Sequence, residues 1–309
     1  MASYLRLYET GELAQRVERA YALLEGCGVC PRRCGVNRLA GEKGKCRTAS
    51  RAVVCSYGPH FGEEAPLVGR FGSGTIFFTH CNLRCLFCQN YTISQLGEGS
   101  EVETEELAAM MLSLQARECH NINLVTPTHV VPQILAALEV AVACGLSIPL
   151  VYNCGGYESL ETLQLLSGVV DIYMPDMKYS DERNARRFSG IKDYPAVNRA
   201  AVKEMHRQVG DLQIDKHGVA SRGLLVRHLV LPYGLAGTAE VAHFLAQEVS
   251  VNTYLNVMAQ YRPEYRAFRI PLLSRPLLRE EFAEEINIVC EQGLRRLDRP
   301  ESRLALVRG

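Results

Sequence analysis

Three closely spaced cysteines constrain this chain more than any other feature. Cys81, Cys85 and Cys88 have C-x3-C-x2-C spacing. Three thiolates at this spacing can bind three irons of a 4Fe–4S cube, for which four cysteines are the usual complement. The fourth iron then stays open to a substrate or a cofactor. We therefore predict an iron–sulfur site with one open position on this segment.

Two other interpretations of the triplet were weighed. A zinc site could use the three cysteines with His80, although His80 and Cys81 are adjacent and would have to point at one metal. A disulfide is not favoured, because an odd number of thiols leaves one over and nothing marks the chain as secreted. The cluster remains the leading prediction, and zinc remains the alternative.

A second group of cysteines precedes the triplet. Cys27, Cys30, Cys34 and Cys46 have C-x2-C-x3-C-x11-C spacing. Four thiolates form a complete tetrahedral ligand set, so a second metal site without an open position is predicted. A proline or glycine directly after Cys30 and Cys34 is typical of zinc knuckles, whereas compact spacing of the first three is typical of ferredoxin-like ligation. Zinc and an iron–sulfur cluster both remain open here.

From residue 74 onward, strand-like and helix-like segments alternate. Short apolar runs predict strands at 75–78, 121–125, 148–152, 170–174, 225–231 and 254–258. Helical patterns separate these runs; Thr104 is a predicted N-cap, and Pro132 opens a helix that Gly145 closes. Six such units predict a parallel sheet with outer helices, two fewer than a closed barrel has. The predicted fold class is α/β, an open partial (β/α)6 barrel.

The chain divides into three predicted parts. Residues 1–70 hold a leading amphipathic helix and the four-cysteine metal-binding segment, residues 71–296 form the barrel, and residues 297–309 are a loosely held tail. Polar or glycine-containing motifs follow the first four strands, at 81–88, 126–129, 153–157 and 175–178. In barrels of parallel strands this edge is the active-site face. Their placement supports a functional site there independently of the cysteine spacing.

Motifs across nearly the whole chain resemble a known family. The cysteine run, with the aromatic Phe87 before its third cysteine, is similar to the signature of the radical S-adenosylmethionine (radical SAM) superfamily. Segments 60–64, 72–78, 121–129, 171–178 and 258–263 resemble a branch related to the pyruvate formate-lyase activating enzyme, which carries an N-terminal four-cysteine segment. The resemblance implies that the open iron chelates SAM and that the reduced cluster splits SAM into methionine and a 5′-deoxyadenosyl radical.

The resemblance also implies roles for individual residues. The cluster ligands match Cys81, Cys85 and Cys88. Phe87 matches the aromatic residue whose backbone borders the SAM adenine. Asp176 and Lys178 resemble a motif beside SAM, while Met174 with Asp176 resembles a monovalent-cation site near the SAM carboxylate.

One motif departs from the family pattern. Activating enzymes usually have Gly-Gly-Glu after the second strand to receive the SAM amino group, and this chain has Thr126-Pro127-Thr128-His129. Hydroxyls and backbone carbonyls can accept the same hydrogen bonds. We therefore expect Thr126 and Thr128 to contact SAM, together with Asn153 after the third strand.

Simpler roles stay open for several of these residues. Asp176 and Lys178 can form an ordinary ion pair at the end of a strand. His129 can contact a ligand or cap the helix that it opens. Gly155 and Gly156 can form only a tight turn, or they can let the backbone approach a ligand closely.

Composition and charge exclude several classes of function. Lys+Arg and Asp+Glu balance at 34 each without a long polybasic block, so neither nucleic acid nor an anionic membrane is a predicted partner. The N-terminus is charged and amphipathic rather than a signal peptide, and the longest apolar stretch, near 140–152, is too short to span a bilayer. Twelve cysteines then indicate metal or redox chemistry. We expect a cytoplasmic protein.

The expected function is hydrogen abstraction by a radical SAM enzyme. The resemblance implies a protein electron donor, such as flavodoxin or ferredoxin, and a glycyl radical enzyme as the protein substrate. One alternative is a radical SAM enzyme that modifies a small molecule or a peptide. The other is a non-catalytic scaffold stabilised by zinc at both groups of cysteines.

Overall fold

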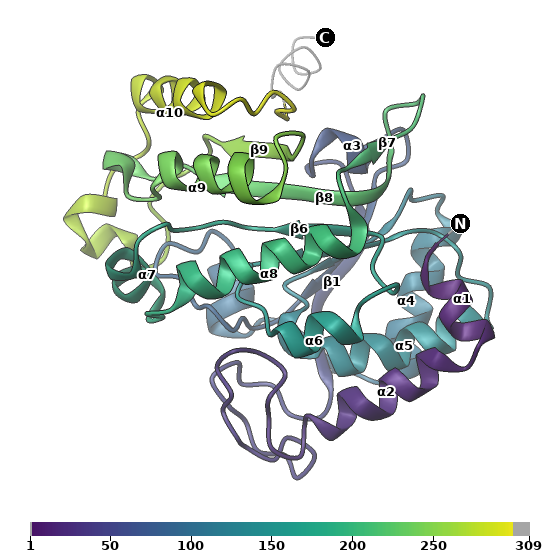
Figure 1. The fold of residues 1–309 in the computed structure, drawn as a ribbon. Helices are drawn as coiled ribbons and strands as arrows, with labels where there is room; N and C mark the ends of the chain where they lie inside the picture. Colours follow the sequence, from purple (N-terminus) through teal and green to yellow (C-terminus); the bar gives the residue numbers. More distant parts are fainter. Residues whose placement is uncertain (1, 299–309) are drawn as a thin grey trace.

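The computed structural model describes residues 2–298, and its centre is a sheet of six parallel strands (Figure 1). These strands are β2 (Ser73–Phe78), β4 (Ile122–Val125), β5 (Leu150–Cys154), β6 (Ile172–Pro175), β8 (Ala220–Leu229) and β9 (Tyr254–Met258). They pair in that order, and within the described residues β2 and β9 do not pair with each other. The sheet is therefore mostly parallel and open, consistent with the predicted partial barrel.

Antiparallel strands that the sequence did not predict extend the sheet. β1 (Ala52–His60) pairs with β2, β3 (Ser100–Val102) pairs with β1, and β7 (Gln213–Ile214) pairs with β8. β1 is a half-exposed strand next to the edge, and it ends in a glycine, a proline and a histidine, so it lacks the continuous apolar run of the central strands. It joins the segment 1–70 to the barrel sheet.

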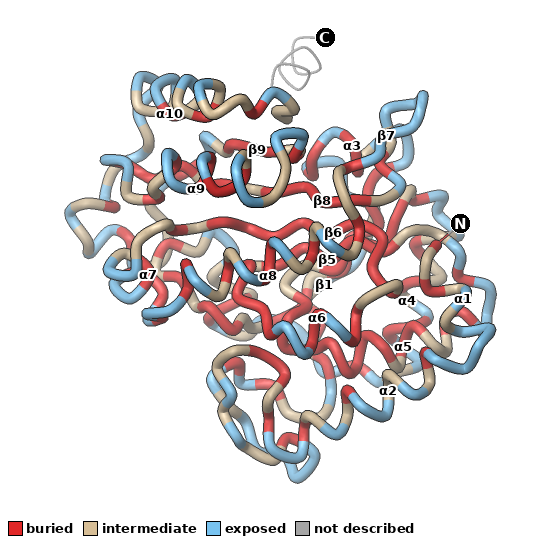
Figure 2. The backbone as a smooth tube through the Cα atoms, in the orientation of Figure 1, coloured by how far each residue is buried: buried red, intermediate tan, exposed pale blue. Residues whose placement is uncertain are grey.

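Most of the helices lie along the outer side of the sheet (Figure 1), while Leu67 of the short α3 packs with Val151 and Met174 on the other face. The helices are α1 (Tyr4–Glu9), α2 (Glu12–Ala22), α3 (Ala65–Val68), α4 (Thr104–Ala116), α5 (Val131–Ala143), α6 (Leu160–Leu165), α7 (Glu182–Ser189), α8 (Tyr194–Val209), α9 (Thr238–Phe244) and α10 (Arg279–Glu291). Figure 2 shows buried backbone along the central strands and exposed stretches on the outer helices. The core therefore lies between the sheet and this helical layer.

Local sequence explains where two of these helices begin and end. α4 begins with a capping box in which the Glu106 side chain accepts from the backbone N–H of Glu103 at 2.8 Å. Thr104, the predicted N-cap, is instead the first helical residue, because the Glu103 carboxylate takes the capping role. α5 has its proline in the first turn and ends before Gly145, which has a φ of +95°. Both ends of α5 are as predicted.

The N-terminal cysteines lie in a long loop rather than on a helix or strand. α2 packs against α5, and the loop that follows it extends below the barrel in Figure 1. At the other end, the backbone N–H of Asp298 donates to the carbonyl of Leu255 at 3.0 Å, so the predicted tail begins attached to β9. The rest of that tail, 299–309, lies outside the described residues. Within 2–298, no helix has the length and apolarity needed to cross a bilayer.

Candidate radical SAM site at the carboxyl edge of the sheet

The three predicted cluster cysteines lie in the loop that leaves β2. Left-handed backbone at His80 (φ +72°) and Arg84 (φ +61°) turns the loop back on itself. The Asn82 side chain anchors the loop by donating to the carbonyl of Tyr157 at 2.9 Å. The loop is therefore a fixed part of the barrel edge.

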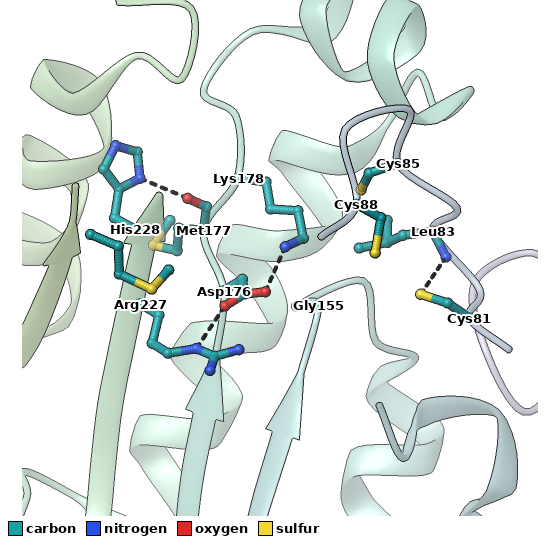
Figure 3. Close-up of polar contacts among 12 residues, drawn as sticks. Cys81, Leu83, Cys85, Cys88, Gly155, Asp176, Met177, Lys178, Arg227 and His228 are labelled. Atoms are coloured by element: carbon teal, nitrogen blue, oxygen red, sulfur yellow. Dashed lines mark hydrogen bonds and ion pairs between the residues drawn. The ribbon is translucent and has the colours of Figure 1, made fainter. Parts of the chain in front are cut away.

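Hydrogen-bond donors surround the three sulfurs. The N–H of Leu83 donates to Cys81 Sγ at 3.4 Å, and the Ser189 hydroxyl donates to Cys85 Sγ at 3.0 Å (Figure 3 shows the first of these). Cys88 Sγ lies 3.1 Å from the hydroxyl of Ser94. Burial raises the pKa of Cys81 to about 12 and also raises that of Cys88. These thiols thus need a bound cation to ionise at neutral pH, and their surroundings already provide donors for the anionic sulfur.

An ion-paired group from two neighbouring strands faces this loop. The Asp176 carboxylate contacts Lys178 Nζ at 2.5 Å and Arg227 Nε at 2.8 Å (Figure 3). Although burial opposes ionisation, the two cations lower the pKa of Asp176, while Asp176 and then Cys85 raise the pKa of Lys178. The predicted strand-end ion pair is present, and it has a second cation that the sequence did not indicate.

Two adjoining cavities connect these groups. The smaller one, of about 200 Å³, is lined by Cys85, Phe87, Cys88, Asp176, Lys178 and Arg227, among others. The larger one, of about 720 Å³, shares Gln89, Asn90, Arg227, Met258 and Gln260 with it. The cysteine loop and the ion-paired group therefore line one cavity that adjoins a larger one, of a size typical of small-molecule sites.

The remaining predicted cofactor contacts divide between the cavities and the core. Phe87 lines the smaller cavity and Asn153 the larger one. Thr128 is fully buried and donates its hydroxyl to Glu158 at 2.7 Å, while Met174 is buried in β6. Thr126 has left-handed backbone (φ +62°) at the end of β4. These last three residues line neither cavity in the described part of the chain.

Residues without an assigned role in the sequence analysis line the larger cavity. His60, Glu63 and Glu64 lie at its wall together with Asn256. Glu64 Oε1 accepts from Asn256 Nδ2 at 2.9 Å and lies 4.0 Å from Arg227 NH1. Arg227 could have been noticed as a charged residue inside an apolar strand run, at the end where functional side chains gather.

Gly155 and Gly156 have a packing role that explains their small size. A Cβ on Gly155 would overlap the Leu83 side chain, and one on Gly156 would overlap the Asp176 carbonyl and Asn198. Gly156 also has a φ of +73°. The two glycines thus let this loop approach both the cysteine loop and the ion-paired group.

The four N-terminal cysteines line one small enclosed cavity. Its wall contains Cys27, Cys30, Cys34 and Cys46. The rest of the wall consists of Val29, Arg32, Arg38, Gly44, Lys45, Asn82 and His129. Close approach of Gly44 to Cys34 and an N–H from Lys45 to Cys34 Sγ at 3.5 Å order the turn before Cys46.

His129 belongs to this second cavity rather than to the large one. It lies in a short 3-10 turn before α5 and is fully buried, with Nε2 donating to the carbonyl of Thr79 at 2.9 Å. Burial lowers the pKa of His129 to about 3, so its ring is neutral. The structure therefore places His129 between the N-terminal cysteines and the strand that leads to the cysteine loop of residues 81–88.

Neither group of cysteines forms a site for a single ion. Within residues 2–298, no three histidine, cysteine or carboxylate side chains are close enough together to hold one metal ion. An iron–sulfur cube binds each thiolate through a different iron, so its ligands stand further apart than those of one ion. The iron–sulfur and zinc alternatives both remain predictions at each group of cysteines.

Comparison with known proteins identifies the family. Residues 75–221 match the model of the radical SAM superfamily. The uncharacterized protein MJ0674 of Methanocaldococcus jannaschii is 32% identical over 288 residues, covering 90% of this chain and 78% of that protein. This chain therefore belongs to the radical SAM superfamily, whose enzymes use a 4Fe–4S cluster and SAM for radical reactions. The similarity extends beyond the matched barrel into the N-terminal and C-terminal parts.

Proposed function

We propose that this chain reductively cleaves SAM at a 4Fe–4S cluster on Cys81, Cys85 and Cys88 and abstracts hydrogen from a substrate in the larger cavity. The observation that carries the proposal is that the cysteine loop and the Asp176 group line one cavity, which shares wall residues with the larger cavity. The cluster, when bound, supplies one electron to SAM, which yields methionine and a 5′-deoxyadenosyl radical.

The side chains of this space bind and orient the reactants. Phe87 packs edge-to-face on Tyr179 and Tyr261, with ring centroids 6.2 and 5.9 Å apart, which fixes an apolar wall beside the cysteines. Lys178 and Arg227 present positive charge that suits the SAM carboxylate.

We propose a glycyl radical enzyme as the substrate, because of the resemblance to the activating enzymes. A flavodoxin or ferredoxin is the proposed electron donor. The size and polarity of the larger cavity favour a second candidate, a small polar molecule held by Glu64, Asn256 and Gln260. No membrane or nucleic-acid partner is part of either proposal, and a cytoplasmic location fits both.

The experiment uses the anaerobically purified chain with SAM and dithionite. We expect 5′-deoxyadenosine by liquid chromatography and mass spectrometry, and absence of the product from fully iron-loaded protein would refute SAM cleavage. An anaerobic pull-down then asks whether a glycyl radical enzyme is captured and gains a glycyl radical in its EPR spectrum. Product formation without a radical on any captured glycyl radical enzyme would favour the small-molecule candidate.

A further inference from the structure

Arg38 is a fully buried cation without a carboxylate partner. Its exposed fraction is 0%, and it lines the cavity of the four N-terminal cysteines. Nε donates to the carbonyl of Ala49 at 3.0 Å and NH1 to the carbonyl of His129 at 2.8 Å, while NH2 has no hydrogen-bond partner. Among residues 2–298, no carboxylate lies within ion-pair distance of Arg38.

A buried guanidinium in this position calls for a negative group in the same cavity. Charges removed from water are stable only when they are paired or coordinate a metal. Four thiolates outweigh the positive charge of a divalent ion or of an oxidised cubane cluster, so a centre bound by all four cysteines is anionic. The centre is therefore the counter-charge that Arg38 lacks.

The position of the N-terminal cysteines beside the catalytic loop favours a redox centre. The four cysteines line one cavity together with the unpartnered NH2 group of Arg38. Asn82, the residue after Cys81, forms part of the same wall. Arg32 donates to the carbonyls of Asn82 and Leu83 at 2.8 and 3.3 Å. The N-terminal centre thus shares a wall with the catalytic loop.

We propose that Cys27, Cys30, Cys34 and Cys46 hold an iron–sulfur cluster whose negative charge is balanced by Arg38, and that Arg38 raises its reduction potential. Reduction adds one electron from a protein donor, which is itself oxidised by one electron, and makes the cluster more negative. A buried cation stabilises that reduced form more than the oxidised form. The inference rests on the proposed function, because an enzyme that consumes electrons can use a second redox centre beside its catalytic loop.

The test uses full-length protein in which Cys81, Cys85 and Cys88 are all replaced by alanine. Iron that remains belongs to the N-terminal centre, so we expect iron and sulfide in equal amounts and no zinc. Arg38→Met in this background should lower the midpoint potential in an EPR redox titration by about 59 mV or more, the value of a tenfold change for a one-electron couple. Arg38→Lys keeps the charge and should shift it less.

A matched control separates burial from charge. Arg47 follows Cys46 directly but is exposed, so Arg47→Met should leave the midpoint potential nearly unchanged because water screens its charge. If Arg38→Met loses the cluster while Arg38→Lys retains it, the iron content shows that a positive charge at this position holds the cluster, which also supports the inference.

Three results would overturn the inference. They are zinc in place of iron, an equal midpoint potential in Arg38→Met and its parent, or equal loss of iron from both Arg38 variants. Failure of the wild-type protein to cleave SAM, with this centre intact, would refute only the proposed function.

Discussion

Replacing Asp176 by asparagine should destabilise the folded chain strongly. The exposed fractions of Asp176, Lys178 and Arg227 side chains are 11%, 18% and 19%, so this is a mostly buried group of one anion and two cations. Asparagine keeps the shape but leaves Lys178 without a carboxylate partner and Arg227 with only the more distant Glu64, 4.0 Å away. Removing one partner of a buried ion pair costs roughly 3–5 kcal/mol. We therefore expect a loss of about 4 kcal/mol in unfolding free energy, or about 6 °C in midpoint temperature.

An exposed pair of the same length provides the control. Lys203 Nζ lies 2.5 Å from Glu248 Oε2, but both side chains are about half exposed, at 48% and 46%. Glu248→Gln should change the midpoint temperature little, because water already solvates both charges. Thermal unfolding by circular dichroism of the anaerobically purified variants measures both effects. A similar small shift in Asp176→Asn and Glu248→Gln would contradict the argument from burial.

The pH dependence of the same variant checks the cause. The pKa of Asp176 is below its ordinary value in the folded state, so its contribution to stability is present at neutral pH and is lost as pH falls through the folded pKa. The Asp176→Asn variant should lack this pH-dependent loss of stability, because it has no carboxylate that titrates at this position. Iron per chain should stay near the wild-type value, whereas SAM affinity, read from the EPR shift of the reduced cluster, should fall. Normal iron with unchanged affinity would leave the ion-paired group a purely structural role.

Three further predictions follow from the same site. Alanine at Cys81, Cys85 and Cys88 together should abolish 5′-deoxyadenosine formation under dithionite, and undiminished product would contradict the assignment of the cluster. Burial raises the pKa of Glu158 to about 7. The unfolding free energy should therefore fall by roughly 3 kcal/mol as pH rises from about 4.5 to 7, and Glu158→Gln should remove this pH dependence in urea titrations. Gly156→Ala should lower the urea concentration at the unfolding midpoint, because Gly156 has a φ of +73° and the Asp176 carbonyl occupies the place of a Cβ. An unchanged midpoint would refute the packing argument.

The sequence predicted the parallel strands well because they are short apolar runs separated by helical patterns. The carboxyl-edge position of the cysteine loop and of Asp176 follows from that alternation alone. Strand β1 was missed because it is half exposed and has no clear alternation of apolar residues. Its pairing with β2 depends on contacts between distant segments, which local patterns do not encode.

The partners within the site were harder to predict than its position. Arg227 reaches Asp176 because β8 lies next to β6, with residues 176 and 227 opposite each other. Thr128 looked like a ligand contact from its place after a strand, yet its hydroxyl supports Glu158 in the core. Arg38 gave no sequence signal, since an arginine in a loop is usually exposed. Such pairings depend on register and on side-chain direction.

The charge of the ion-paired group bears on what the smaller cavity can bind. Both oxygens of Asp176 are occupied, one by Lys178 and the other by Arg227. Two cations and one carboxylate thus line the smaller cavity, while Arg227 also lies 4.0 Å from Glu64 at the wall of the larger one. A monovalent cation at Asp176, which the resemblance implies, would have to displace Lys178 or share its oxygen against repulsion from both cations. A carboxylate such as that of SAM would instead meet two donors already fixed in place. The group thus favours an anionic substituent beside Cys85 and Cys88, on the side of the cavity where SAM is proposed to bind.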